Sequence, residues 1–301
     1  MKVVAAVEFN KVKEQGIQAL YPGKQLSDFD VNKLAISVLS SGFKGLDDFK
    51  MLKKDRGELI LLGARPSQGK SGLGFQIATQ VAEHSKVHIF SLEMDHESIV
   101  SRQASIALDK PLDYIQRGLA PADELDAVKA RLARLNCIVD DEPGLNIHQI
   151  CSRARDIHSV SKTSLIVVDY IQIIAHNRGN NIAAELGEIS AGLKALAKEL
   201  RIPVIALSQL NRNSELREDG TPQLADLKGS GSLEQDADVV LLLHRPEDTP
   251  STAIINVAKN RNGPTGEVEL YFAAGQCRFL ELTKTPKTIL RKVVDNQDSL
   301  D

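Results

Sequence analysis

Residues 58–71 read ELILLGARPSQGKS, and this stretch decides the fold. The apolar run Glu58–Gly63 predicts a buried strand, and residues 71–83 predict a helix directly after the loop. A loop between a strand and a helix N-terminus gathers backbone N–H groups at the positive end of the helix dipole, which favours phosphate. The stretch therefore predicts a phosphate-binding loop, although Ala64 stands where the full pattern has its first glycine. In this interpretation Lys70 meets the β- and γ-phosphates of a nucleotide, and the Ser71 hydroxyl meets Mg²⁺.

Downstream of this stretch, short apolar runs alternate with segments of helical periodicity. The expected strands are residues 86–91, 136–140, 164–169, 203–208, 239–244, 252–259 and 267–272. The expected helices are residues 97–108, 146–160 and 182–200, with one more that opens at Pro121 and carries Leu125, Val128, Leu132 and Leu135 on one face. The alternation is typical of an α/β fold with a doubly wound, mostly parallel sheet, to which the last strands add an antiparallel hairpin.

Three polar residues follow expected strands. Asp169 comes after four apolar residues, which predicts a carboxylate at the carboxyl edge of the sheet, where it could hold Mg²⁺. Glu93 could orient and deprotonate an attacking water. Gln209 could sense a γ-phosphate and relay its state to the following loop. The plainer alternatives are an Asp that caps a turn and a solvated loop Glu.

Two loops and a pair of cations are candidates for contact with a partner. The stretch Asp226–Ser232 is rich in small residues, and its backbone N–H groups could hold a nucleic-acid phosphate. The stretch Asn177–Asn181 is a second loop at a strand end. Lys259 and Arg261 precede a Gly-Pro turn and could reach a phosphate on a partner. The alternatives are a mobile linker for the first loop and ordinary surface charges for the cations.

Composition narrows the class of protein. The 301 residues include 37 Lys and Arg against 40 Asp and Glu, so no global basic field exists and any nucleic-acid contact must be local. The longest apolar run, around residues 165–175, is interrupted by Asp169 and is too short to span a membrane. The three cysteines are scattered, which argues against a disulfide framework or a zinc cluster and favours the cytoplasm.

Three segments are expected along the chain. Residues 1–40 form an arm or linker helix, which lies either on its own domain or on a neighbouring subunit. Residues 41–281 form the main domain, and residues 282–301 form a polar, solvated tail.

Seven motifs, in the same order, resemble the C-terminal motor domain of the DnaB-type replicative helicases, which share the RecA-like ATPase fold. The resemblance runs from about Ser41 to Phe272. Its motifs are residues 64–71, 90–94, 166–172, 193–197, 203–212, 231–238 and 258–266. An alanine at position 64 is also usual in this family.

The resemblance implies a role for each matching residue. Lys70 and Ser71 hold phosphate and metal, Glu93 activates water, and Asp169 holds the metal shell. Gln209 couples the γ-phosphate to DNA, and Arg261, with Lys259, is an arginine finger that completes a neighbouring subunit's site. The residues expected to bind ATP are Ala64, Arg65, Pro66, Ser67, Gln68, Gly69, Lys70, Ser71 and Arg102. The residues expected to bind DNA are Arg178, Lys228, Gly229, Ser230 and Gly231.

The resemblance also implies an assembly. Family members form rings of six subunits that move 5′ to 3′ on single-stranded DNA and unwind the duplex, with ATP and Mg²⁺ as cofactors. A primase or a helicase loader is the implied protein partner, and the implied location is the cytoplasm, which is that of a bacterial host if a phage encodes the chain.

The sequence departs from the family pattern in three ways. Lys228-Gly229 replaces the usual Arg-Glu pair, and His244 replaces the usual aromatic residue before Arg245. Only about 40 residues precede the motor, so the family's N-terminal collar domain is expected to be absent, as in a phage or plasmid short form.

Two other functions share the expected fold. One is a RecA-like recombinase or an ATP-driven clock or regulator that does not unwind DNA. The other is a ring that serves as an adaptor without hydrolysis, against which the joint presence of Lys70, Glu93, Asp169 and Arg261 argues.

Overall fold

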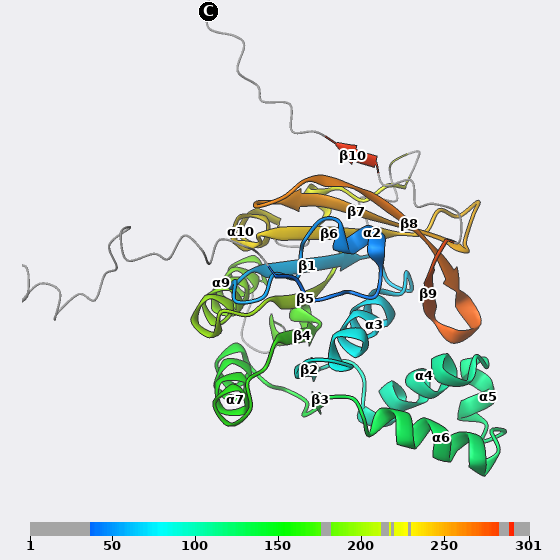
Figure 1. Cartoon of the computed structure of the whole chain (residues 1–301). Coiled ribbons are helices and arrows are strands. Elements are labelled where there is room, and N and C mark those ends of the chain that lie inside the picture. Colours follow the sequence, from blue (N-terminus) through cyan, green and yellow to red (C-terminus); the bar gives the residue numbers. More distant parts are fainter. Residues whose placement is uncertain are drawn as a thin grey trace, which may run out of the picture. The chain divides into compact units, whose positions relative to one another are not determined.

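Strand β1 (Leu59–Ala64) lies in the middle of a ten-stranded sheet, with β5 (Val204–Gln209) on one side and β6 (Val239–His244) on the other. The computed structural model describes residues 37–175, 182–211, 217, 220–227, 230–282 and 289–291. The described helices and strands belong to one compact unit, which begins at Val38 (Figure 1). The expected arm of residues 1–40 and the loop Asn177–Asn181 lie almost wholly outside the described residues.

The parallel half of the sheet continues from β5 through β4 (Leu165–Asp169) and β2 (Val87–Ser91) to β3 (Cys137–Asp140). Its register places Ala64 beside Gln209 and Ser91 beside Asp169, so the ends of four strands meet at one edge. The strands β1, β2 and β4 are buried at every position, as continuous apolar runs between two helical layers predict. The expectation of a doubly wound, mostly parallel sheet is confirmed.

The antiparallel part is larger than the expected hairpin. Beyond β6 come β7 (Thr252–Asn260) and β8 (Thr265–Ala273), and β8 then pairs with β9 (Arg278–Glu281) and β10 (Ile289–Arg291). The expected solvated tail of residues 282–301 therefore contributes a strand at residues 289–291, because these residues hydrogen-bond to the start of β8.

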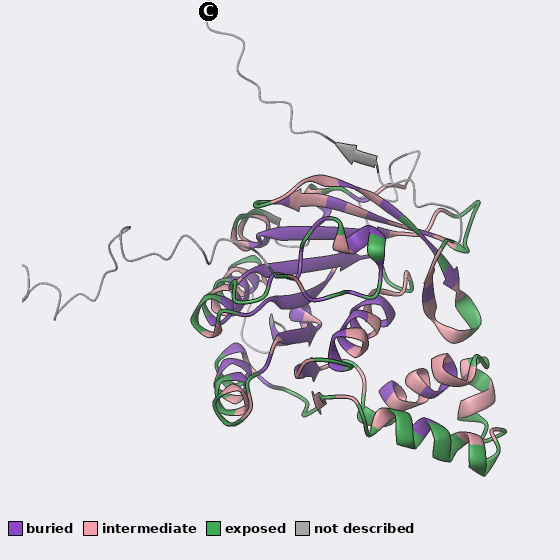
Figure 2. Ribbon diagram, in the orientation of Figure 1, coloured by how far each residue is buried: buried purple, intermediate pink, exposed green. Residues whose placement is uncertain are grey.

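Helices cover both faces of the sheet (Figures 1 and 2). One apolar core packs α3 (Lys70–Ala82) and α2 (Lys44–Asp47) against β1, β7 and β8. The other core packs α7 (Ile147–Val160), α8 (Ile171–Ala175), α9 (Ile182–Leu200) and α10 (Ser230–Asp236) against the opposite face. The helix start predicted at Asn146 is confirmed by a capping box, in which the Asn146 side chain accepts from the Gln149 N–H at 3.1 Å.

A helical insertion between β2 and β3 is the main disagreement with the expected core. It consists of α4 (His96–Leu108), α5 (Leu112–Gln116) and α6 (Ala122–Leu132). Helix α6 follows Pro121 as predicted, but only Val128 is buried in it and Leu125 is 42% exposed. The periodicity predicted the helix correctly, but its apolar face is buried only in part because this helix lies beside the sheet (Figures 1 and 2).

The short helices α8 and α10 were not predicted. Asp226–Ser232 was expected to be a flexible loop, but Leu224–Asp226 form a 3₁₀ turn and Ser230 begins α10. Helix α10 is fixed by tertiary contacts: Leu233 is fully buried, and the Glu234 carbonyl oxygen accepts from Lys259 Nζ at 2.5 Å. Such contacts override a Gly- and Ser-rich sequence, for which intrinsic helix propensity is low.

His88, in the middle of β2, makes the unfolding free energy depend on pH. Its side chain is fully buried beside Phe90, with ring centroids 4.0 Å apart, and neither nitrogen has a hydrogen-bond partner within the described part of the chain. Burial lowers the pKa of His88 from 6.5 to about 4, and the nearby charges of Asp140 and Arg153 act in opposite directions on it. Below pH 6.5 the imidazole of His88 therefore binds a proton in the unfolded chain, whereas in the folded chain it stays neutral until the pH reaches about 4.

We expect this proton to reduce the free energy of unfolding by about 2 kcal/mol between pH 7 and pH 5, and the loss continues until the pH reaches about 4. Replacing His88 by leucine should remove that share of the pH dependence, whatever it does to stability at pH 7. Equilibrium denaturation at both pH values measures the difference. The exposed His84→Leu variant is the control, and an equal pH dependence in the His88→Leu and control proteins would contradict the assignment.

Candidate active site

The phosphate loop joins the end of β1 to the first turn of α3. Ala64 is the last residue of β1 and is buried, so this position is extended and does not need the glycine of the full pattern. Gly69 precedes α3 with φ at 97°, and a Cβ there would lie 2.8 Å from a ring atom of Phe279. A side chain is therefore excluded at Gly69 by both backbone conformation and space. The first N–H groups of α3 have no partner within the helix and face this loop.

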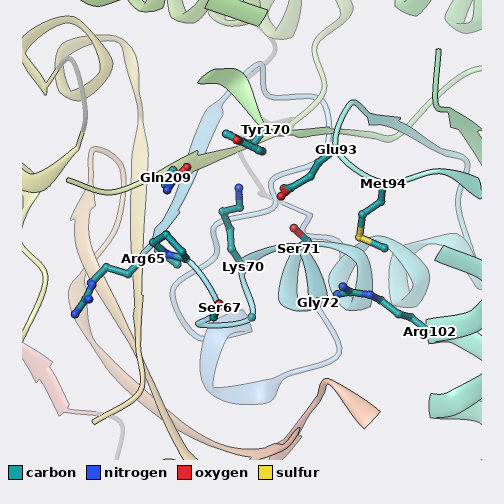
Figure 3. A pocket seen from close by; sticks show the side chains of 13 residues that line it. Arg65, Ser67, Lys70, Ser71, Gly72, Glu93, Met94, Arg102, Tyr170 and Gln209 are labelled. Carbon is teal, nitrogen blue, oxygen red and sulfur yellow. The ribbon is translucent and has the colours of Figure 1, made fainter. Parts of the chain in front are cut away.

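A pocket of about 370 Å³ opens above the loop at the carboxyl edge of the sheet (Figure 3). All of the expected ATP-binding residues except Gln68 line it, together with Glu93 and Gln209. Gly72, Met94 and Tyr170 also line the pocket and were not predicted. Tyr170 follows Asp169 directly, so its position beside a strand-end carboxylate is the signal that could have identified it.

Lys70 reaches the centre of the pocket (Figure 3). Its Nζ lies 3.4 Å from Asp169 Oδ1 and 3.8 Å from the centroid of the Tyr170 ring. Burial lowers the pKa of Lys70, while the negative charges of Asp169 and Glu93 oppose that shift. The contact with the Tyr170 ring is a cation–π interaction, which holds the ammonium between the ring and the carboxylate.

Asp169 is fully buried, and neither carboxylate oxygen has a hydrogen bond within the described residues apart from the longer ion pair with Lys70. Such a carboxylate needs a further cationic partner. Oxygen ligands from one carboxylate, a hydroxyl and nucleotide phosphates suit Mg²⁺. Ser71 lines the pocket and supplies the hydroxyl, whereas Asp169 is not among the lining residues and lies next to Lys70. The residues present therefore fit Mg²⁺. The described part of the chain holds no group of three or more His, Cys, Asp or Glu residues suited to a metal ion, so an all-protein metal cage is not found there.

Glu93 enters the pocket from the segment after β2 and points toward Lys70 and Ser71 (Figure 3). Partial burial of its carboxyl raises the pKa of Glu93, and the nearby charge of Asp169 raises it further. Lys70 and Arg102 oppose the shift. A carboxylate with a raised pKa is a better proton acceptor, so the geometry suits a general base.

Arg245 braces the phosphate loop from the end of β6 and was not predicted as a site residue. Its Nη2 donates to the Ser67 carbonyl oxygen at 2.6 Å, and its backbone N–H donates to Gln68 Oε1 at 2.8 Å. The guanidinium lies 4.2 Å from the centroid of the Phe272 ring. The side chain of Gln68, expected to bind ATP, thus accepts from Arg245, and Gln68 does not line the pocket.

Lys259 and Arg261 lie at the opposite edge of the sheet from this pocket. Asn260 pairs with Val239 and Val239 pairs with Ile60, whereas the phosphate loop begins after Ala64. Four strand residues separate the two edges, which is about 13 Å. Arg261 is exposed, and its guanidinium contacts Asp238 Oδ1 at 3.3 Å and the Gln235 carbonyl oxygen at 3.0 Å. The pair therefore does not contribute to the pocket of its own chain.

The expected DNA-binding residues are described only in part. Arg178, Lys228 and Gly229 lie outside the described residues. Ser230 and Gly231 form the first turn of α10.

The comparison with protein-family models decides the assignment. Residues 38–281 match the model described as DnaB-like helicase C terminal domain. The chain belongs to this family. Nucleotide binding follows from membership, since the family's domain is an ATPase, and the family resemblance found in the motifs is confirmed.

Curated relatives agree with this family. The chain is 37% identical to the replicative DNA helicase DnaB of Geobacillus stearothermophilus over 263 residues, which cover 83% of this chain and 58% of the relative. It is 34% identical to the replicative DNA helicase DnaC of Bacillus subtilis over 289 residues, which cover 92% of this chain and 63% of the relative. The chain thus spans less than two thirds of the length of these relatives.

Two solved structures show the same fold. One, described as an ATPase domain, superposes with a TM-score of 0.76 at 29% identity, and the match covers 89% of this chain and 98% of that one. A DnaB-like replicative helicase, described with its interactions with primase, also has a TM-score of 0.76, at 27% identity, over 93% of this chain and 74% of that one. The expected RecA-like architecture is confirmed. Among the described residues, no helix combines the length and apolar character that crossing a membrane requires.

Proposed function

We propose that this chain is the motor of a DNA helicase that hydrolyses ATP between the subunits of a six-membered ring and moves 5′ to 3′ on single-stranded DNA. One observation carries the proposal: a phosphate loop, Glu93, Asp169 and Gln209 converge at one edge of the sheet, while Lys259 and Arg261 lie at the other. Each chain therefore carries a nucleotide pocket at one edge of its sheet and a pair of cations suited to such a pocket at the opposite edge. A second copy is needed to bring a pocket and the cations together, which supports a ring.

Within one pocket, each residue has a separate task. The N–H groups of the loop and the Lys70 ammonium hold the phosphates, and the Glu93 carboxylate accepts the proton of the attacking water. Ser71 and Asp169 would hold Mg²⁺, which supplies positive charge to the phosphates when bound. Phosphoryl transfer needs little covalent help, so positioning and charge neutralisation provide the rate.

The neighbour's cations complete the proposed site. Arg261, with Lys259, reaches the γ-phosphate held by the next subunit and neutralises the charge that develops there. An arginine that is exposed and remote from its own pocket is suited to this role.

DNA is proposed to contact the segment between η4 (Leu224–Asp226) and α10, which includes Lys228 and Gly229, and the loop with Arg178. With one lysine and several small residues, the first segment suits contact with the sugar-phosphate backbone, which carries no sequence information. One solved neighbour is described with its interactions with primase, and we propose a primase or a loader as a partner of this chain too. We place its activity in the cytoplasm.

Unwinding of forked DNA tests the proposal. We expect the purified chain, with ATP and Mg²⁺, to displace a strand from DNA that offers a 5′ single-stranded arm for loading. We expect no displacement from DNA that offers only a 3′ single-stranded arm. The Lys70→Ala protein should bind DNA without displacing a strand, because it lacks the ammonium that holds the phosphates. Native mass measured with nucleotide should give six copies. ATP turnover without displacement on either fork, with strand exchange instead, would favour the recombinase.

A further inference from the structure

Gln172 makes a reciprocal pair of hydrogen bonds with the peptide groups of Gln209. Gln172 Nε2 donates to the Gln209 carbonyl oxygen at 3.1 Å, and the Gln209 N–H donates to Gln172 Oε1 at 3.1 Å. Gln172 Nε2 also donates to Ser208 Oγ at 2.9 Å. The side chain is buried, at 3% exposure, so these bonds are shielded from water. A buried amide with both of its ends paired has one orientation, and it imposes that orientation on its partner.

The pair lies beyond the point where β4 stops pairing with β5, while Gln209 still pairs with Ala64 of β1 on its other side. Strand β4 pairs with β5 only as far as Val168 and Ala206, three residues before Gln209. Beyond that point the chain turns from β4 into α8. The Gln172 side chain, in α8, hydrogen-bonds to the edge of β5 with which β4 no longer pairs. The side chain thus acts as the missing strand for the last residue of β5, because an amide offers the same donor and acceptor as a peptide group.

The same short segment also contains the carboxylate that pairs with Lys70. Asp169 ends β4, and Gln172 follows three residues later. On the other side, Gln209 continues into Leu210, which pairs with Leu227, and the Asn211 N–H donates to the Asp226 carbonyl oxygen at 2.8 Å. Gln172 therefore links the segment of Asp169 to the strand end that leads toward residues 228 and 229.

We infer that Gln172 is a positioning residue for ATP turnover, which fixes the backbone of Gln209 so that the Gln209 side chain meets the γ-phosphate in one orientation. This inference rests on the proposed function, because it takes Gln209 as the γ-phosphate contact. Gln172 does not line the pocket and acts through Gln209.

Replacing Gln172 by methionine keeps the length of the side chain and removes the two hydrogen bonds with Gln209 together with the one to Ser208, and this change tests the inference. We expect kcat for ATP with single-stranded DNA to fall about 10- to 100-fold, as for other displaced reacting groups, while KM for ATP changes less than about threefold. Ser208→Ala is the matched control, since it removes one bond of the same amide and leaves the pair with Gln209 intact. Its kcat should stay within about threefold of the wild type.

A double variant separates positioning from general loss of structure. If Gln172 acts through Gln209, Gln172→Met should add nothing to the defect of Gln209→Ala, whereas independent effects multiply. Hydrogen exchange of the peptide spanning residues 204–211 gives a readout without ATP, and exchange at the Gln209 N–H should be faster in Gln172→Met.

Each remaining outcome decides a different question. Multiplying defects, or wild-type kcat in Gln172→Met, would overturn the role of Gln172 while the ATPase itself stands. A wild-type chain without ATP turnover would instead refute the proposed function. If Gln172→Met does not fold, Gln172→Glu replaces it, because its carboxylate still accepts from the Gln209 N–H. Failure of both variants to fold would make Gln172 a structural residue and overturn the inference.

Discussion

An Arg261→Ala protein should bind ATP as the wild type does and hydrolyse it about 10³–10⁵ times more slowly, the range known for arginine fingers. The reason is the position of Arg261 at the amino edge of the sheet, remote from the phosphate loop of its own chain. Removing this guanidinium leaves nucleotide binding within one pocket intact but takes away the charge that stabilises the transition state in the next pocket. Steady-state ATPase rates and equilibrium binding of a fluorescent ATP analogue measure the two effects separately.

Mixing two defective variants tests whether Arg261 acts on the pocket of a neighbouring subunit. Arg261→Ala supplies a complete pocket without a finger, and Lys70→Ala supplies a finger with a defective pocket. Rings assembled from both proteins should regain part of the turnover that each protein lacks alone. Arg117→Ala, which removes an exposed arginine paired with Asp113 in the helical insertion, is the control for loss of surface charge. Full turnover by Arg261→Ala protein alone would exclude the finger.

The contacts of Arg261 within its own chain bear on this experiment. Its guanidinium pairs with Asp238, which also pairs with Lys194 and accepts from the Leu59 N–H at 2.8 Å. Asp238 therefore keeps partners when Arg261 is replaced, and the fold should survive. Arg261 is exposed whereas Asp238 is buried, and Asp238 keeps Lys194 as its cationic partner, so no buried charge is left unpaired. The expected loss of turnover is too large to arise from a loss of stability.

The parallel half of the fold could be predicted because its strands are apolar on both faces. A continuous run such as Leu165–Val168 has one stable environment, between two layers of helices. The order of such strands then brings Asp169 and Gln209 to the same edge as the phosphate loop, and the structure places them there. Strand ends therefore predict where Asp169 and Gln209 lie, whereas the roles of these residues came from the family resemblance.

The parts that could not be predicted depend on tertiary contacts. Helix α10 has a Gly- and Ser-rich start, and the partners that support it, Lys259 and Arg261, come more than twenty residues later in the chain. The brace from Arg245 to Ser67 joins residues 178 positions apart, and no local pattern signals it. Leu125 shows a different limit, since its spacing predicts the helix but not how far the apolar face of that helix is covered.

A Glu93→Gln protein should keep ATP in the pocket and hydrolyse it about 10²–10⁴ times more slowly, the share that a positioned base contributes. The change removes a proton acceptor and keeps the shape of the side chain, so the phosphates still find the loop and Lys70. Because the pKa of Glu93 is raised by burial and by Asp169, the wild type should lose turnover on the acid side at a higher pH than an ordinary glutamate would impose.

Glu97→Gln is the matched control for this prediction, since Glu97 is exposed in the first turn of α4 and only four residues away. The Glu97→Gln protein should hydrolyse ATP at the wild-type rate and should lose activity at the same acidic pH as the wild type. Single-turnover measurements of bound ATP distinguish slow chemistry from slow product release, and the Glu93→Gln defect should lie in the chemical step. If Glu93→Gln hydrolysed bound ATP as fast as Glu97→Gln does, the Glu93 carboxylate would not be the base, and the attacking water would have to be activated by another group.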